Sequence, residues 1–503
     1  MLLVRPCLAV PLLALLFFPP DARAKDKPSA LPAHVPVFAA DLTLTEAVKI
    51  AVRQNPDLLK QLQEIERTRG QIIEVRAEAL PHLTLNAGYD QRAKDLFEQG
   101  SGTGGTNTFD TTELDPAIQE ILAALGASRS GARPIQNKSW QVTLQVQQVL
   151  YAGGQVKSAI KIARFTEDAA YYQLRDTVDQ VIAVVRTQFT TVLTNRALIK
   201  VAEETVRLQT DQLGDQKNRF EAGTVPRFNV LRAEVELANV QPDLIRARNN
   251  YLLAEIALAK TLGLAPGPAG KPTFNVVGSL DITERNLGLQ SALELARARR
   301  PFLKVQRQQI LQQTERIKVA LAGYKPRLEA NAGWEVRNSR LSEDLDKTVD
   351  GWFFGVTGKW NIFDGLATYG RVKQARASLE SARINYDDSV QKVDLEVQTA
   401  YANLQTARET IRSQQKNVEQ ANESLRLANE RFSAGAGTQL EVLDARTALT
   451  KARSTELQSR GDYNAALAEF DRATATDTVY AEPFRDPLEK LEGKVLPRAK
   501  QKK

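Results

Sequence analysis

The stretch Trp140-Gln-Val-Thr-Leu-Gln-Val146, followed by Tyr151-Ala-Gly-Gly154, decides the fold of this chain of 503 residues, because its pattern occurs twice. The second copy begins at Trp352 and ends in Phe363-Asp-Gly365. A constant shift of 212 residues joins Trp140 to Trp352, Gly153 to Gly365, Phe220 to Phe432 and Gly223 to Gly435. A repeat kept in register without a gap indicates one structural unit that is used twice.

The first 24 residues have the features of a secretory signal. Arg5 supplies a positive charge, residues 8–18 form an apolar run too short to span a bilayer, and Ala22-Arg-Ala24 is a cleavage site. Cys7, the single cysteine, precedes the apolar run, which does not favour a lipid anchor. We therefore expect removal of residues 1–24, and an exported chain without disulfides that begins with an extended, Pro- and Lys-rich leader at 25–40.

An alternation of apolar and polar side chains marks strands in both copies. It covers residues 83–90 and 140–147 in the first copy, and 328–337 and 354–362 in the second. Such alternation predicts β-hairpins with one apolar and one polar face. A Gly-, Ser- and Thr-rich insertion between residues 90 and 139 lies at the tip of the first hairpin, where extra length costs little stability.

Apolar heptads follow both hairpins and predict long coiled-coil helices. Their members are Val178, Val185, Val192, Ile199, Val206, Leu213 and Phe220, and then Val390, Val397, Leu404, Ile411, Val418, Leu425 and Phe432. At 1.5 Å per residue, the first of these helices would be roughly 100 Å long. Return helices are predicted near 226–262 and 439–475. Shorter helices are predicted before the first hairpin, at 45–54 and at 56–79, with Asn55 as the N-cap of the second.

These elements divide the chain into units. We predict a first repeat at 41–262, a Gly- and Pro-containing linker at 263–286, a second repeat at 287–475 and a basic tail at 476–503. The overall class is therefore α+β, with strands at one end of each repeat and a helical hairpin at the other.

The strands have the length and the aromatic ends that are typical of outer-membrane barrels. Amphipathic hairpins packed on a soluble core would give the same alternation and are commoner among proteins. Export, the missing cysteines and helices long enough to span a periplasm favour the membrane interpretation. Four strands per chain cannot close a barrel, because hydrocarbon tolerates no open sheet edge, so several chains must contribute. No later segment approaches 18 consecutive apolar residues, which excludes a helical span.

Together these motifs resemble the TolC-like outer-membrane efflux proteins over about residues 42–474. The resemblance rests on the duplication, on their order and spacing, and on particular motifs: Asn55-Pro56, Pro81-x-Leu83, Pro326-x-Leu328, Phe363-Asp-Gly365 and Val442-Leu-Asp-Ala445. It implies a homotrimer with one twelve-stranded transmembrane β-barrel in outer-membrane lipid, and an α-helical barrel that crosses the periplasm. It also implies an exit duct for efflux or type I secretion that works with a periplasmic adaptor and an inner-membrane pump.

The ends of the long helices are candidate functional sites. Arg219, Phe220 and Gly223 end the first long helix, and Arg431, Phe432 and Gly435 end the second. A glycine suits a left-handed helix cap and an arginine suits the negative helix end, so these residues have a structural role on their own. The resemblance adds docking of the adaptor at both tips.

Two acids at the start of the last helix, Glu441 and Asp444, lie three residues apart and therefore on one helix face. Acids at a helix N-terminus favour the helix dipole, which is one explanation of their presence. The resemblance implies another, an acidic constriction of the periplasmic entrance, with Glu in place of the more usual Asp at 441. The first tip is basic, with Arg227 and Arg232, so salt bridges between tips could keep the entrance shut.

Other classes of function have little support in the sequence. His34 and His82 are the two histidines, and no cysteine follows the signal, so a metal cluster or a cysteine nucleophile is not expected, nor is an enzyme or a cofactor. Of the net charge of +7, +4 lies in the tail, where residues 483–503 hold seven Lys or Arg and three acids, and this does not indicate a nucleic-acid partner. A periplasmic coiled-coil adaptor or scaffold without a membrane barrel is the alternative, and the exported substrate is not encoded in any motif.

Overall fold

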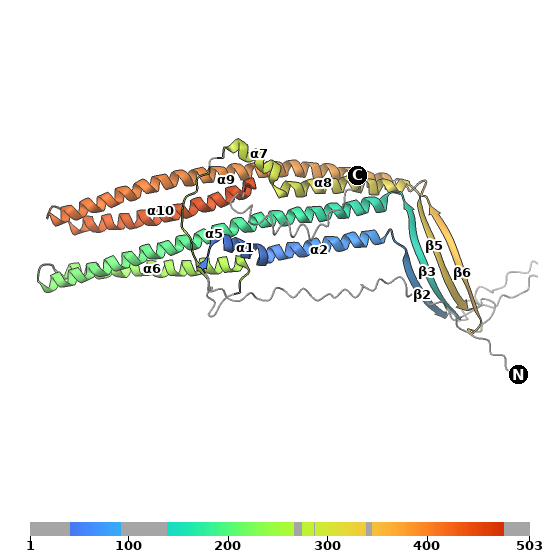
Figure 1. Cartoon of the computed structure of the whole chain (residues 1–503), viewed down its shortest axis with the longest axis horizontal. Helices are drawn as coiled ribbons and strands as arrows, with labels where there is room; N and C mark the ends of the chain where they lie inside the picture. The colour runs from blue at the N-terminus through green and yellow to red at the C-terminus, as the bar shows by residue number, and fades with distance from the viewer. Residues whose placement is uncertain (1–40, 92–137, 266–273, 286, 339–344, 477–503) are drawn as a thin grey trace, which may run out of the picture.

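The protein is an elongated molecule with a β-sheet at one end and two helical tips at the other (Figure 1). The computed structural model describes residues 41–91, 138–265, 274–285, 287–338 and 345–476. The predicted signal peptide, the leader, His34, most of the glycine-rich insertion, part of the linker and the tail from 477 onward lie outside these residues.

Long helices make up most of the described chain, and equivalent helices of the two repeats match in length. The long helices α5 and α9 have 67 residues each, and the return helices α6 and α10 have 36 each. Within the described ranges the helices are α1 (Leu44–Gln54), α2 (Pro56–Ala77), α5 (Gln155–Glu221), α6 (Arg227–Leu262), α7 (Leu289–Arg299), α8 (Pro301–Leu321), the 3-10 turn η3 (Ala322–Tyr324), α9 (Ala367–Ser433) and α10 (Gln439–Thr474).

The strands of the described residues form two sheets. A two-stranded parallel pair joins β1 to β4, and a four-stranded antiparallel sheet has the order β2-β3-β5-β6. The strands are β1 (Asp41–Leu42), β2 (His82–Gln91), β3 (Lys138–Ala152), β4 (Asn275–Val276), β5 (Arg327–Asn338) and β6 (Thr348–Lys359).

Local signals fix where the shorter helices begin. The Asn55 side chain accepts hydrogen bonds from the N–H groups of Asp57 and Leu58, and Pro56 occupies the first helical position, as the sequence predicted. The Asn55 Nδ2 also donates to the carbonyl of Thr261 at 2.8 Å, which ties this helix start to the end of α6. Helix α2 ends at Ala77, slightly before the predicted position near 79.

The four-stranded sheet has one apolar face, as the alternation predicted. Leu85 lies opposite Leu144, Leu144 opposite Trp334, and Trp334 opposite Trp352, so a single row of large apolar side chains crosses all four strands. Trp352 is 77% exposed. Exposure of a continuous apolar face marks a surface that contacts another protein or lipid.

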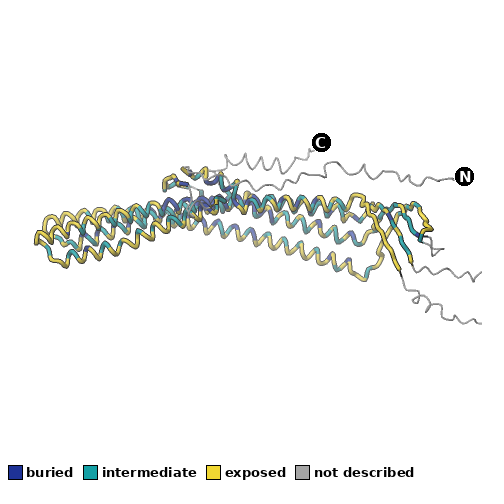
Figure 2. The backbone as a smooth tube through the Cα atoms, turned by 90° about the horizontal axis from the view of Figure 1, so that it is seen from below, coloured by how far each residue is buried: buried dark blue, intermediate teal, exposed yellow. Residues whose placement is uncertain are grey.

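The hydrophobic core lies midway along the helices, where buried residues gather in Figure 2. The heptad residues Val185, Val192 and Val397 are completely buried there, among side chains from the neighbouring helices. Towards the tips the same heptads become exposed, and Phe220 retains 43% of its accessible surface. The cause is that two helices of one hairpin cannot enclose a side chain, whereas the middle section also packs α5 against α8, α10 and α2. None of the described helices is long and apolar enough to cross a membrane.

Candidate functional site

Both helical tips are closed by the same backbone turn. Gly223 has φ of +73° and Gly435 has φ of +72°, values that favour glycine. In the first tip the N–H of Gly223 donates to the carbonyl of Phe220 and the N–H of Thr224 to that of Arg219, both at 2.9 Å. The second tip repeats this pair of bonds through Gly435 and Ala436. The predicted left-handed caps are therefore present at both ends.

The two predicted acids of the second tip lie in different surroundings. Thr438 is the N-cap of α10, and its side chain accepts a hydrogen bond from the N–H of Glu441. The Glu441 carboxylate lies 3.8 Å from the Arg431 guanidinium of the same hairpin. Asp444 is exposed, one turn further along, and makes no ion pair among the described residues. Glu441 therefore has a structural role in its own tip, and Asp444 is the freer charge.

The first tip has no comparable cap. Pro226 is the N-cap of α6 and makes no side-chain cap hydrogen bond, and Lys217 of α5 pairs with Glu234 of α6 at 3.5 Å. Within the part of the chain that the structure describes, no ion pair joins Arg227 or Arg232 to Glu441 or Asp444. A salt bridge of the kind predicted between tips is thus not formed within one copy of the chain.

Arg232 lies instead in a groove of about 270 Å³ between the two hairpins. Glu236 of α6 and Arg446 of α10 also line this groove, as do Leu440 and Leu443 at the start of α10. The tertiary structure therefore brings the basic first tip against the helix that carries Glu441 and Asp444, although the arginines of that tip form no ion pair with these two acids.

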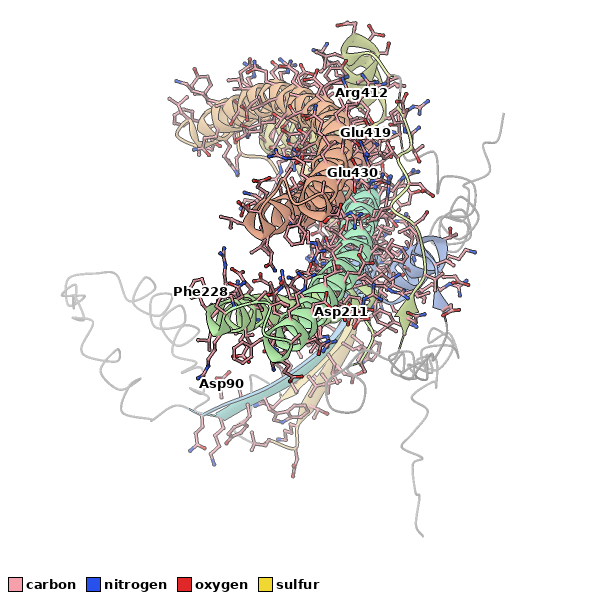
Figure 3. The ribbon with its side chains drawn as sticks, turned by 90° about the vertical axis from the view of Figure 1, so that its left-hand side faces the viewer. Asp90, Asp211, Phe228, Arg412, Glu419 and Glu430 are labelled. Atoms are coloured by element: carbon pink, nitrogen blue, oxygen red, sulfur yellow. The ribbon has the colours of Figure 1, made fainter. Side chains whose placement is uncertain are left out.

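Apolar side chains at the first tip are a feature that our sequence analysis missed. Phe228, which Figure 3 labels at the end of the green hairpin, is 67% exposed. Leu231 and Val235 follow it on the same helix and are also exposed, as is Leu440 on α10. The spacing of Phe228, Leu231 and Val235 is that of a single helix face and could have indicated an apolar contact surface.

No metal site accompanies these tips. Across the described ranges, no group of three or more His, Cys, Asp or Glu side chains could hold a metal ion.

Comparison with known proteins identifies the family. The sequence profile described as "Outer membrane efflux protein" matches residues 47–264 and 292–476, which is most of the chain and includes both repeats. The chain belongs to the outer membrane efflux protein family. It is accordingly a TolC-like outer-membrane protein, with its long helices as a periplasmic domain.

Individual members of this outer membrane efflux protein family resemble parts of the chain. The outer membrane protein TolC of Escherichia coli (strain K12) is 26% identical over 216 residues, which cover 43% of this chain and 39% of TolC. The alkaline protease secretion protein AprF of Pseudomonas aeruginosa is 23% identical over 208 residues, 41% of this chain and 36% of AprF. The chain thus aligns with less than half the length of these relatives.

The likeness in fold extends further than the likeness in sequence. The CmeC outer membrane channel of Campylobacter jejuni superposes with a TM-score of 0.67 at 17% identity, and the match covers 86% of this chain and 85% of CmeC. The mixture of long helices and a small sheet predicted from the sequence is therefore the fold of known outer-membrane channels.

Proposed function

We propose that three copies of this chain form an exit duct through the outer membrane. The observation that carries the proposal is the open four-stranded sheet. Among the described strands, β2 and β6 each pair with one neighbour, and each therefore has an edge of unpaired N–H and C=O groups. The row from Leu85 to Trp352 makes one face of the same sheet apolar.

A sheet with an apolar face and unpaired strand edges must assemble with further copies of the chain. Placing the apolar face in lipid removes large side chains from water, but an unpaired strand edge in hydrocarbon costs several kcal/mol per group. Pairing β2 of one copy with β6 of the next satisfies both edges. Three copies then give a closed barrel of twelve strands, which is within the range of outer-membrane barrels.

The helical parts extend this duct through the periplasm. In each copy the first repeat at 41–262 and the second repeat at 287–475 would supply the helices that form the wall of the duct. The linker at 263–286 would connect the two repeats. The heptad residues that are exposed towards the tips, including Phe220 and Phe432, would be covered by neighbouring copies and by a partner.

The partners proposed are a periplasmic adaptor and an inner-membrane pump, in a tripartite efflux or type I secretion system. Support comes from the family membership and from AprF, whose name describes secretion of a protease. The adaptor would dock on the two tips, at Arg219, Phe220 and Gly223, at Arg227 and Arg232, and at Arg431, Phe432 and Gly435. The exposed Phe228 would add an apolar contact to that surface.

A ring of Glu441 and Asp444 from three copies would narrow the periplasmic entrance and attract cations. The exposure of Asp444 supports its part in this ring. The pairing of Glu441 with Arg431 gives Glu441 a second, local role. A scaffold without a membrane barrel is disfavoured, because it gives no use for the exposed apolar face of the sheet and does not agree with an outer-membrane family.

Cysteine cross-linking tests the assembly directly. Thr84 on β2 and Thr357 on β6 lie on the polar face near the helical end of the sheet. The double variant Thr84→Cys/Thr357→Cys is expected to form oxidised covalent trimers in outer-membrane fractions, and each single variant is not. The pair Thr84→Cys/Thr210→Cys serves as a control, since Thr210 lies far along α5.

The purified trimer is also expected to run as a heat-modifiable band and to open ion-conducting pores in planar bilayers. A protein that is recovered as a soluble periplasmic monomer, with no cross-link and no pore, would contradict the proposed function.

A further inference from the structure

A cluster of cations lies where the helices meet the sheet, away from the tips. A hollow of about 590 Å³ opens there between α8, α9 and the adjoining ends of β5 and β6. Its lining contains five basic side chains and no acid: Arg316 of α8, Lys325, Arg327, Lys359 and Arg371 of α9. All five side chains are exposed. We call this group of five the junction cations.

The sheet register forces two of these cations together. Arg327 and Lys359 lie directly opposite each other in the β5–β6 ladder. Like charges at directly opposed positions destabilise a sheet, so this pairing opposes stability. A local arrangement that works against stability is characteristic of a functional site.

Nearby carboxylates neutralise only part of the charge. Glu329 forms an ion pair with Arg327, and Asp364 lies 3.4 Å from Arg371. Arg316, Lys325 and Lys359 make no ion pair with any described residue. Five cations and two carboxylates leave a net charge of +3 in each copy.

Side-chain alternation decides which way the hollow opens. Arg327 and Lys359 alternate along their strands with Leu328 and Gly358, and they share a face with Glu329 and Thr357. This is the polar face, opposite the row that ends at Trp352. In the duct proposed above, on which this inference rests, the polar face is the interior, so Arg327 and Lys359 face the lumen, and the other three junction cations line the same hollow.

We propose that the junction cations form an anion-binding site inside the duct, at the level where the helical tunnel becomes the barrel. The ligand class is a small solute with a phosphate, sulfonate or carboxylate group. Arginine and lysine side chains bind such oxygens through short, charge-assisted hydrogen bonds. Three copies of the site around one lumen concentrate anions there, because a confined cleft of one sign focuses its field.

The first test uses single-channel recording with inorganic tripolyphosphate as the probe. The purified trimer is placed in bilayers of zwitterionic phosphatidylcholine, so that no lipid headgroup supplies a net negative charge. Tripolyphosphate is expected to reduce the current in a concentration-dependent way, and less so at high KCl because salt screens exposed charges. Absence of any block by tripolyphosphate in an open pore would overturn the inference, and block that requires added phosphatidylglycerol would assign the cations to lipid headgroups and overturn it too.

Paired variants separate charge from structure. Arg316→Gln/Lys359→Gln removes two cations that have no ion-pair partner, and it is expected to weaken block by about tenfold or more, since hydrogen bonds to charged groups contribute about 1.5–3 kcal/mol each. The matched control Arg316→Lys/Lys359→Arg keeps both charges and is expected to retain the block. Equal loss in both variants would show that the positive charge is not the cause.

A binding measurement keeps the inference distinct from the proposed function. Titration calorimetry of the detergent-solubilised full chain is expected to detect tripolyphosphate binding, and to lose it in Arg316→Gln/Lys359→Gln. A chain that forms no pore but still binds the anion with this dependence would contradict the duct while supporting the site. A chain that conducts ions but binds no anion would contradict the site alone.

Discussion

Arg186 of α5 donates a hydrogen bond of 2.8 Å to the carboxylate of Asp471 in α10, 285 residues away in the sequence. Asp471 is 1% exposed, and Arg285 contacts its other oxygen at 3.1 Å. This buried pair ties the long helix of the first repeat to the last helix of the second. It therefore fixes how the two repeats pack, in the middle of the molecule where the core lies.

Replacing the buried carboxylate should destabilise the fold strongly. Asp471→Ala removes the buried carboxylate that Arg186 and Arg285 contact, and removing one member of such a buried pair costs about 3 kcal/mol. Thermal or denaturant unfolding of the detergent-solubilised protein, followed by circular dichroism, measures the loss. The control Glu423→Gln breaks a pair with Arg426 whose two side chains are both 54% exposed, and it should leave the curve unchanged. Equal effects of the two substitutions would contradict the structural role of Asp471.

Two glycines with the same φ allow the cost of backbone strain to be measured separately from the cost of steric overlap. Gly263 and Gly223 both have φ of +73°, but a Cβ on Gly263 would lie 2.4 Å from the carbonyl oxygen of Gln54, whereas a Cβ on Gly223 meets nothing within 4 Å. Gly223→Ala should cost about 1 kcal/mol through the left-handed conformation alone. Gly263→Ala should cost clearly more, because α1 must move away from the end of α6. Comparable melting temperatures for the two variants would show that this close approach is absent.

A third glycine marks the contact between α10 and α5. A Cβ on Gly461 would lie 2.6 Å from the Thr194 Oγ1, which itself donates to the Thr190 carbonyl. Gly461→Ala should therefore lower the melting temperature. Gly214→Ala, in open space within α5, should raise stability by about 0.5–1 kcal/mol because alanine favours a helix. Opposite signs for the two variants are the expected result, and stabilisation by both would contradict the packing of α10 on α5.

The carboxylate of Glu315 should make stability depend on pH. Burial raises the pKa of Glu315, but hydrogen bonds from Lys318, Ser158 and Lys161 outweigh burial and hold the pKa below its ordinary value. An acid whose pKa is lower in the folded than in the unfolded protein stabilises the fold at pH values above the unfolded pKa of about 4.3. This stabilisation is lost as the pH falls through the folded pKa. Glu315→Gln should accordingly lower the melting temperature at neutral pH, and its deficit should disappear in acid.

Melting curves between pH 3 and pH 7 measure this difference. Glu419→Gln, at an exposed position of α9 that Figure 3 labels, is the matched control and should leave the melting curve unchanged. A deficit of Glu315→Gln that is the same at every pH would contradict an ionic role for Glu315.

The proposed acidic entrance predicts a change in conductance. Asp444→Asn removes an exposed charge without affecting a cap, so it should raise single-channel conductance or weaken block by divalent cations. Glu441→Ala should do the same, but it should also weaken the tip, because the Thr438 hydroxyl and the Arg431 guanidinium both lose the Glu441 carboxylate as a partner. Conductance and cation block that are unchanged in Asp444→Asn and in the double variant Glu441→Ala/Asp444→Ala would exclude the constriction.

Much of the fold was predictable from local periodicity. The alternation at Trp140 and Trp352, the heptads through Val185 and Val397, and the cap residue Asn55 each specify an element through its nearest neighbours in sequence. The glycines that end α5 and α9 were predictable for the same reason. The exposed face at Phe228 carried a local signal as well, although our sequence analysis did not use it.

The sequence by itself determined the repeat, the sheet with one apolar face, the long helices and the position of their caps. Only the tertiary structure decided that Arg186 meets Asp471, that Glu441 pairs with Arg431, and that Arg327 lies opposite Lys359 among the junction cations. Periodicity predicts which face of an element is apolar, because this pattern depends on residues a few positions apart. It does not predict which distant side chains contact each other, because strand register and helix packing depend on all the elements together.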